Sequence, residues 1–141
     1  MMLKPELVKE ILQMIGDGEY VGTPLGDLYK HFLNEDIKGA SENEFQKFVY
    51  HMDELFDAEL FKTRNLNAQR RWGKSQSVGG SRSYANVPLV LTPLGGEVLK
   101  ELNKPKGLER LMQGIRSAGS AAGQEALKYG VKELFRGALG S

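Results

Sequence analysis

The sequence predicts an α+β fold that is mainly α, followed by a helical appendage. Apolar residues recur at helical spacing early in the chain, two short β-prone runs follow, and a polar loop joins those runs. With 141 residues, 40% of them hydrophobic, the chain can build one core, and it has no cysteine for disulfides. We therefore predict a domain over residues 1–103 and an appendage over residues 104–141.

Two helices are expected at the start of the chain. Pro5 suits the first turn of a helix, and apolar side chains at spacings of one, three or four continue to Ile15. Thr23, followed by Pro24, is typical of a helix cap with proline at the first helical position. The second helix should be short and end near Asn34.

A third helix is predicted over residues 42–58. Ser41 and Glu44 have the spacing of a capping box, in which each side chain satisfies a free backbone amide of the first turn. An apolar stripe then predicts the buried face of this helix, made of Phe45, Phe48, Val49, Met52, Leu55 and Phe56.

Two strands and a fourth helix complete the predicted domain. Leu60–Arg64 and Val87–Leu91 are β-prone, and the segment between them, residues 65–86, is too polar to pack and should project into solvent. Thr92-Pro93 begins the last helix, which should close the domain near Asn103. This order of elements is that of a winged helix-turn-helix, with the third helix as the reader and the hairpin as the wing.

The appendage should form two amphipathic helices that need a partner. Glycines recur through them, each costing about 1 kcal/mol in a helix interior, so either the domain or a second copy must cover their apolar face. Lys128, Lys132 and Arg136 beside this face also allow an anionic membrane surface, although Glu125 and Glu133 reduce that case. The candidate homodimer or partner residues are Gly123, Leu127, Gly130, Val131, Leu134 and Phe135.

Charge is strongly segregated along a chain whose net charge is only +1. Residues 1–59 carry a net −8, residues 60–96 hold six basic residues and no carboxylate, and residues 97–141 carry a net +3. Surface charges act over about 8 to 10 Å, so the basic middle segment can attract a polyanion despite the neutral total.

Duplex DNA is therefore the expected partner. Basic and aromatic side chains on the wing can reach phosphates or a minor groove, and amide side chains on the first half of the third helix can reach bases. The candidate nucleic-acid-binding residues are Asn43, Gln46, Lys47, Tyr50, Arg64, Arg70, Arg71, Trp72, Lys74 and Arg82. Tyr84 adds a further aromatic ring to the wing.

The acidic second half of the third helix is the main objection to DNA binding. Asp53, Glu54, Asp57 and Glu59 would repel a phosphate backbone if this half entered a groove. Either only the first turns approach DNA, or the scaffold binds protein and its acidic first half occupies a site meant for a polyanion. A basic loop that serves only solubility is the third alternative.

Other chemistries find little support in the sequence. Residues 68–75 fit a relaxed phosphate-loop pattern, but neither the following helix nor a strand ending in Asp is present. Two histidines and no cysteine leave no metal-binding set, and no nucleophile has an activating partner in sequence. We expect no cofactor, no metal and no enzymatic activity, and, without an apolar run of membrane-spanning length or a leader, a cytoplasmic protein.

Three motifs stand out along the chain: Tyr50-His51-Met52 with Leu55, then Ala58-Glu59-Leu60-Phe61, and Leu91-Thr92-Pro93-Leu94-Gly95-Gly96 with Leu99. They resemble an uncharacterised, largely prophage-associated bacterial family, over roughly residues 1–103. Glu59 stands where that family has glycine, which weakens the expected helix stop, and Gly96 stands where it has histidine. The resemblance implies a winged-helix fold and a phage or prophage setting, and no demonstrated activity.

Together these observations predict a DNA-binding winged-helix regulator that contacts DNA through its third helix and basic wing. The alternative is a phage-encoded protein-binding module that inhibits a host nucleic-acid-handling defence complex.

Overall fold

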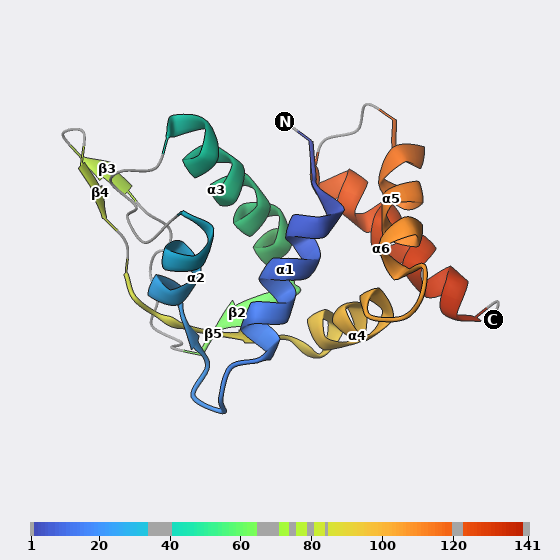
Figure 1. Ribbon diagram of the computed structural model, residues 1–141, viewed down its shortest axis with the longest axis horizontal. Helices are drawn as coiled ribbons and strands as arrows, with labels where there is room; N and C mark the ends of the chain where they lie inside the picture. Colours follow the sequence, from blue (N-terminus) through green and yellow to red (C-terminus); the bar gives the residue numbers. More distant parts are fainter. Residues whose placement is uncertain are drawn as a thin grey trace.

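The computed structural model describes residues 2–33, 41–64, 71–73, 76–78, 81–83, 85–119 and 123–139. These residues form an α+β fold that is mainly helical (Figure 1). In chain order the elements are α1 (Pro5–Gly16), β1 (Thr23–Pro24), α2 (Leu25–Phe32), α3 (Glu42–Asp57), β2 (Phe61–Thr63), β3 (Gln76–Val78), β4 (Ser81–Ser83), β5 (Pro88–Leu91), α4 (Pro93–Leu102), α5 (Gly107–Ser117) and α6 (Gly123–Leu139).

A small antiparallel sheet joins segments that are far apart in the sequence. Its strand order is β1-β5-β2, with Thr23 opposite Leu89 and Phe61 opposite Leu91. β3 and β4 form a separate hairpin. Helices α1 to α3 with this sheet and hairpin are compatible with a winged helix, although the sequence did not reveal β1 as a strand.

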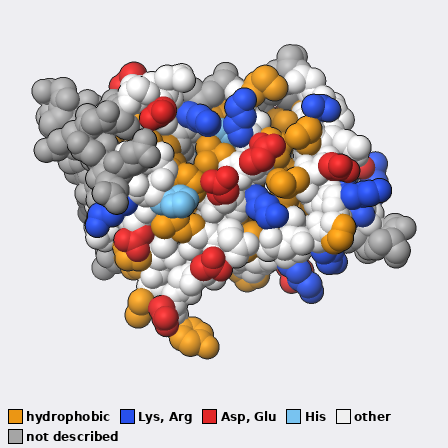
Figure 2. All heavy atoms as spheres, viewed as in Figure 1, with side chains coloured by type: hydrophobic (Ala, Val, Ile, Leu, Met, Phe, Trp, Pro, Cys, Tyr) orange, Lys and Arg blue, Asp and Glu red, His pale blue; other side chains and the backbone are white. Residues whose placement is uncertain are grey.

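The elements are arranged from the hairpin at one end to the appendage at the other. In Figure 1 the β3–β4 hairpin and the start of α3 occupy the left end, and α5 and α6 occupy the right end. Figure 2, from the same side, shows Lys and Arg side chains gathered toward the α5–α6 end, with apolar side chains projecting from the lower edge. Tyr20, in the turn between α1 and β1, is 92% exposed.

The apolar stripe predicted for α3 faces the core. Its members from Phe45 to Leu55 are buried, and Phe56 is half-buried against the same cluster. The core also takes the inner faces of α1, α2 and α4, so burial of these stripes from water supplies the main driving force for folding.

Two of the three predicted caps are confirmed. The Ser41 hydroxyl accepts a hydrogen bond from the Glu44 amide, and the Thr92 hydroxyl accepts one from the Gly95 amide. The prediction for Thr23 is wrong, because Thr23 pairs in β1 and its hydroxyl donates to carbonyls at the end of α1. α2 is capped from a distance instead, by the Asn86 side chain, which accepts from the Gly26 amide at 2.8 Å.

The end of α3 is a Schellman turn built with glutamate. The Leu60 amide donates to the Leu55 carbonyl and the Glu59 amide donates to the Phe56 carbonyl, which satisfies two carbonyls of the last turn. Glu59 has φ of 62°, a left-handed conformation that glycine adopts without steric cost. The helix therefore stops at the expected place, even though the glycine of the resembling family is absent.

The appendage packs within its own chain. α6 contacts α3, α4 and α5, while Leu127 and Leu134 are fully buried in the same cluster as the rest of the core. A Cβ on Gly114 would lie 2.4 Å from the Tyr129 carbonyl oxygen, and one on Gly130 would lie 2.7 Å from Leu111, so these glycines permit the close approach of α5 and α6.

Three of the residues predicted as a dimer or partner surface, Leu127, Gly130 and Leu134, are buried within the chain itself. Val131 and Phe135 also pack against the core, and Gly123 begins α6. The prediction of a dimer surface is wrong for Leu127, Gly130 and Leu134, because α5 and the core already occupy their contacts. Within the described part of the chain, no helix combines the length and apolarity that crossing a bilayer requires.

His51 ties the start of α1 to α3. Its ring is fully buried, its Nε2 accepts from the Lys4 amide at 2.8 Å, and its Nδ1 lies 2.8 Å from the Lys47 carbonyl. This pairing requires the neutral ring with the proton on Nδ1. Burial lowers the pKa of His51 below its ordinary 6.5, and the Lys47 and Lys4 ammonium groups lower it further, while the bond to the Lys47 carbonyl opposes them.

Replacing Glu59 by glycine should stabilise the protein. The change removes a left-handed conformation that costs an L-residue about 1 kcal/mol, partly offset by the greater freedom of glycine in the unfolded chain. We expect Glu59→Gly to raise the free energy of unfolding by about 0.5 kcal/mol in urea titration, and Glu59→Gln to leave it unchanged. A loss of stability in Glu59→Gly would contradict the left-handed assignment.

The stability of the protein should depend on pH through His51. The unfolded chain binds a proton at this ring near pH 6.5, whereas the folded chain resists it, so the free energy of unfolding should fall as pH drops below about 6.5. The slope from this group is at most about 1.4 kcal/mol per pH unit. Urea titrations from pH 7.5 to 5 should show a shallower slope in His51→Gln than in the wild type.

The matched control is His31→Gln, since His31 is the other histidine and is exposed. This variant should keep the wild-type dependence on pH. An equal slope in His51→Gln and the wild type would show that the ring does not resist protonation.

Candidate nucleic-acid interface

The first half of α3 presents polar side chains to solvent. Asn43, Gln46 and Lys47 are exposed, opposite the buried stripe, and the Gln46 amide donates to the Glu42 carboxylate at 2.9 Å. Tyr50, the fourth predicted contact on this helix, is half-buried, with its ring against that of His51. Three of the four predicted contacts are therefore accessible, and Tyr50 is partly so.

Residues 71–73 turn sharply as the chain leads toward the hairpin. Arg71 has φ of 55° and Gly73 has φ of 87°, both left-handed. A Cβ on Gly73 would lie 2.6 Å from the Ala85 carbonyl oxygen and 2.9 Å from Leu25, so only glycine fits between the returning strand and α2. The turn directs the side chain between them, that of Trp72, into the protein.

Trp72 is part of the core. It is 0% exposed, its ring meets that of Phe48 edge-on at 6.4 Å, and its indole N–H donates to the Asp53 carboxylate at 2.9 Å. The prediction that Trp72 contacts nucleic acid is therefore wrong. So is the expectation that the whole segment between β2 and β5 is too polar to pack, because Trp72 supplies a large apolar surface and its polar N–H has an acceptor.

Arg71 lies over the acidic half of α3. Its guanidinium contacts the Asp57 carboxylate at 2.5 Å and the Asp53 carboxylate at 3.7 Å. The same group lies 5.0 Å from the ring centre of Phe56. Two of the four carboxylates that opposed DNA binding thus have partners from the start of the wing.

The electrostatic field of α3 remains negative. Residues 42–57 hold five carboxylates and one lysine, a net −4, and Arg71 reduces this to −3. Burial raises the pKa of Glu54 above its ordinary 4.5, and Asp57 and Asp53 raise it further, whereas Arg71 lowers it. One Glu54 carboxylate oxygen is buried with no hydrogen-bond partner, which accounts for the unfavourable charged form.

The remaining wing residues are less fully placed. Arg82 belongs to β4, although its side chain lies outside the described residues, and Arg70 and Lys74 also lie outside them. The backbone of the hairpin lies at the same end of the molecule as the start of α3 (Figure 1). The structure therefore brings the hairpin and the exposed polar part of α3 to one end.

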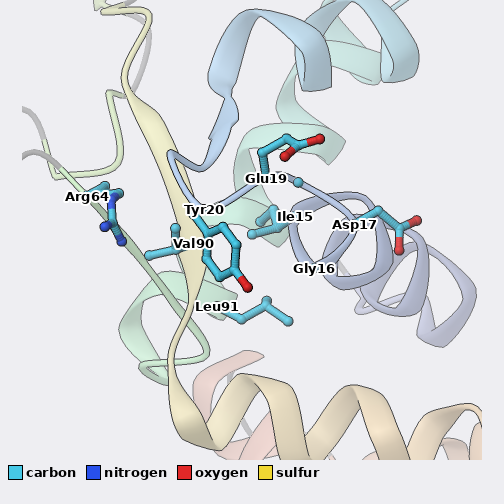
Figure 3. A pocket seen from close by; sticks show the side chains of 9 residues that line it. Ile15, Gly16, Asp17, Glu19, Tyr20, Arg64, Val90 and Leu91 are labelled. Atoms are coloured by element: carbon cyan, nitrogen blue, oxygen red, sulfur yellow. The ribbon is translucent and has the colours of Figure 1, made fainter.

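Arg64 lies apart from that end. It is exposed after β2, its amide donates to the Pro88 carbonyl at 2.8 Å, and its side chain lines a pocket with the turn between α1 and β1. Figure 3 shows Arg64 and Tyr20 on this pocket, with Asp17 and Glu19 on the α1 side. The pocket has a volume of about 480 Å³, and its two carboxylates make it a poor site for a polyanion.

Two further hollows lie on the described part of the molecule. One lies along α1 between Glu6 and Leu108, and one lies beside Phe56 and Leu94, with volumes of about 660 Å³ and 580 Å³. Among the described residues, no group of three His, Asp or Glu side chains could hold a metal ion.

Sequence reasoning missed the roles of Asp53 and Asp57. These residues were interpreted as repelling DNA, whereas the structure uses them to hold Trp72 and Arg71. The signal was the complementarity of an acidic helix half and the basic segment after it in the chain.

The chain matches no protein-family model, no curated protein and no solved structure. The resemblance to the prophage-associated family therefore stays a prediction.

Removing the acceptor of Trp72 should destabilise the protein. Asp53→Ala leaves a buried indole N–H without a partner, at a cost of about 1 to 3 kcal/mol. Trp72 is the single tryptophan, so its fluorescence reports this site directly. Urea unfolding followed by this fluorescence should show the loss in Asp53→Ala, and a smaller loss in Asp53→Asn, which keeps an acceptor oxygen. Equal stability of Asp53→Ala and the wild type would rule out the bond.

Proposed function

We propose that the chain is a winged-helix protein that binds duplex DNA through the first half of α3 and the basic β3–β4 hairpin, without catalysis, as a regulator would. The sheet order β1-β5-β2 and the helices α1 to α3 support the fold assignment. The expected basic charge of the wing supports the choice of DNA as the ligand.

The docking of residues 71–73 on α3 is the observation that carries the proposal. Trp72 anchors the start of the wing against α3, and the hairpin that follows lies toward the same end of the molecule as the start of that helix (Figure 1). Asn43, Gln46 and Lys47 are then exposed at the same end as the wing. Amide side chains of this kind bond to adenine edges, and lysine bonds to guanine or phosphate.

The same docking answers the objection from the acidic half of α3. Trp72 donates to Asp53 and Arg71 pairs with Asp57, so the start of the wing supplies partners for two carboxylates of that half. Arg71 forms no ion pair with Glu54 or Glu59. These two carboxylates therefore limit how closely the second half of α3 can approach phosphates. Within α3, DNA contact is therefore proposed for the first turns alone, and the wing supplies the rest of the DNA-binding face.

A protein partner is the second candidate, because α3 keeps a net negative charge after Arg71 is counted. An acidic helix of this kind fits a basic surface on a protein that normally binds nucleic acid. The DNA-binding measurement described next separates the two functions.

DNA binding should depend steeply on salt and on the wing. Four phosphate contacts give a slope of log affinity against log salt of about −4, which is a loss of roughly a hundredfold or more between 50 and 200 mM. Replacing Arg70, Lys74 and Arg82 by glutamine should reduce the magnitude of that slope by about 3. Fluorescence anisotropy of a labelled 20-base-pair duplex measures both quantities.

The matched control removes the same charge from the opposite end of the molecule. Lys128, Lys132 and Arg136 are exposed on α6, so their replacement by glutamine changes the net charge equally but leaves the wing intact. This variant should keep the wild-type slope. Equal losses in both variants would indicate a general charge effect, and no binding at 50 mM salt would favour the protein partner.

A further inference from the structure

We propose that Asp57 withholds Arg71 from DNA, so that this ion pair sets how strongly the wing binds phosphate regardless of sequence. The inference rests on the proposed function. It makes Asp57 and Arg71 residues that determine selectivity between DNA sequences. The Asp57 carboxylate binds the Arg71 guanidinium in the place where a DNA phosphate would otherwise bind.

The contacts at the base of the wing differ in how firmly they hold. Trp72 is 0% exposed and donates to Asp53, so this contact fixes the path of the chain. The Arg71 and Asp57 side chains are 45% and 37% exposed, and they meet at the solvent edge of the same joint. The bond between Trp72 and Asp53 is therefore an anchor. The ion pair between Arg71 and Asp57 can open while that anchor stays in place.

The geometry makes Asp57 a substitute for phosphate. Its carboxylate lies 2.5 Å from the terminal nitrogen of Arg71, the distance of a charge-assisted hydrogen bond. Phosphate oxygens bind the same planar donors of guanidinium, and an exposed ion pair is weak enough for them to compete. Asp53, at 3.7 Å and engaged by Trp72, is the weaker competitor for Arg71.

Arg71 lies at the start of the wing. It has a left-handed φ of 55°, and its guanidinium lies 5.0 Å from the ring centre of Phe56, at the solvent edge of α3. A rotation of the side chain alone would bring the guanidinium away from Asp57, since Trp72 holds the backbone. If Arg71 bound a phosphate, the Asp57 carboxylate would lose its partner and would repel the same DNA. This repulsion disfavours the contact on any duplex whose sequence does not fit the other DNA-binding residues.

A double-mutant cycle tests this role. Asp57→Asn removes the competing charge and keeps the shape, so it should tighten binding to a random-sequence 20-base-pair duplex at 100 mM salt by about three- to tenfold. It should also steepen the salt slope by about 1, as one added phosphate contact requires. Arg71→Gln should change affinity less than about twofold alone and should abolish the gain when combined with Asp57→Asn.

The control is Glu59→Gln, which removes an exposed carboxylate two residues from Asp57 that has no ion pair with Arg71. Trp72 fluorescence, measured on each variant without DNA, should keep the emission maximum of the wild type and so show that the anchor holds. A gain in Glu59→Gln equal to that in Asp57→Asn would overturn the inference while the proposed function stands. The inference would also be overturned if Arg71→Gln lowered DNA affinity equally in the wild type and in Asp57→Asn. A wild-type protein that binds no DNA would overturn both the inference and the proposed function.

Discussion

The rest of the structure depends on one joint, the burial of Trp72 against Phe48 and Asp53 of α3. A polar loop cannot hold a fixed position by itself, because each ordered residue costs about 1 to 2 kcal/mol of backbone entropy. Burial of the indole ring, with its N–H bonded to Asp53, offsets part of this cost at a single point. Gly73 then allows a close approach to the segment that enters β5, because a Cβ there would lie 2.6 Å from the Ala85 carbonyl oxygen.

This joint connects the fold to the proposed function. The same three residues place a buried ring against the core and a guanidinium against the acidic half of α3. Two of the carboxylates that oppose DNA binding by α3, Asp53 and Asp57, therefore hold the start of the wing. The amide-bearing first half of α3 is exposed, and the backbone of the hairpin lies at the same end of the molecule (Figure 1). The contacts of Trp72 and Arg71 with Asp53 and Asp57 lie in the other half of the helix.

Much of the fold could be predicted because its signals are local. The stripe of α3, the caps Ser41 and Thr92 and the two helices of the appendage follow from spacing within a few residues. β1 could not be predicted, since its pairing with β5 joins positions 23 and 89 and a Thr-Pro pair equally suits a helix start. The burial of Trp72 was missed for the same reason, because its acceptor and its aromatic neighbour lie on α3, about 20 residues earlier in the chain.

The claim that the first half of α3 and the hairpin form one DNA-binding face is tested most directly by amide chemical shifts. A 20-base-pair duplex, added in steps to the isotope-labelled protein at low salt, should shift the amides of residues 43–47 and of the hairpin, residues 76–83, along one binding curve. The amides of α6 should stay in place. Shifts confined to α6, or curves for α3 and the hairpin that saturate at different DNA concentrations, would contradict a single face.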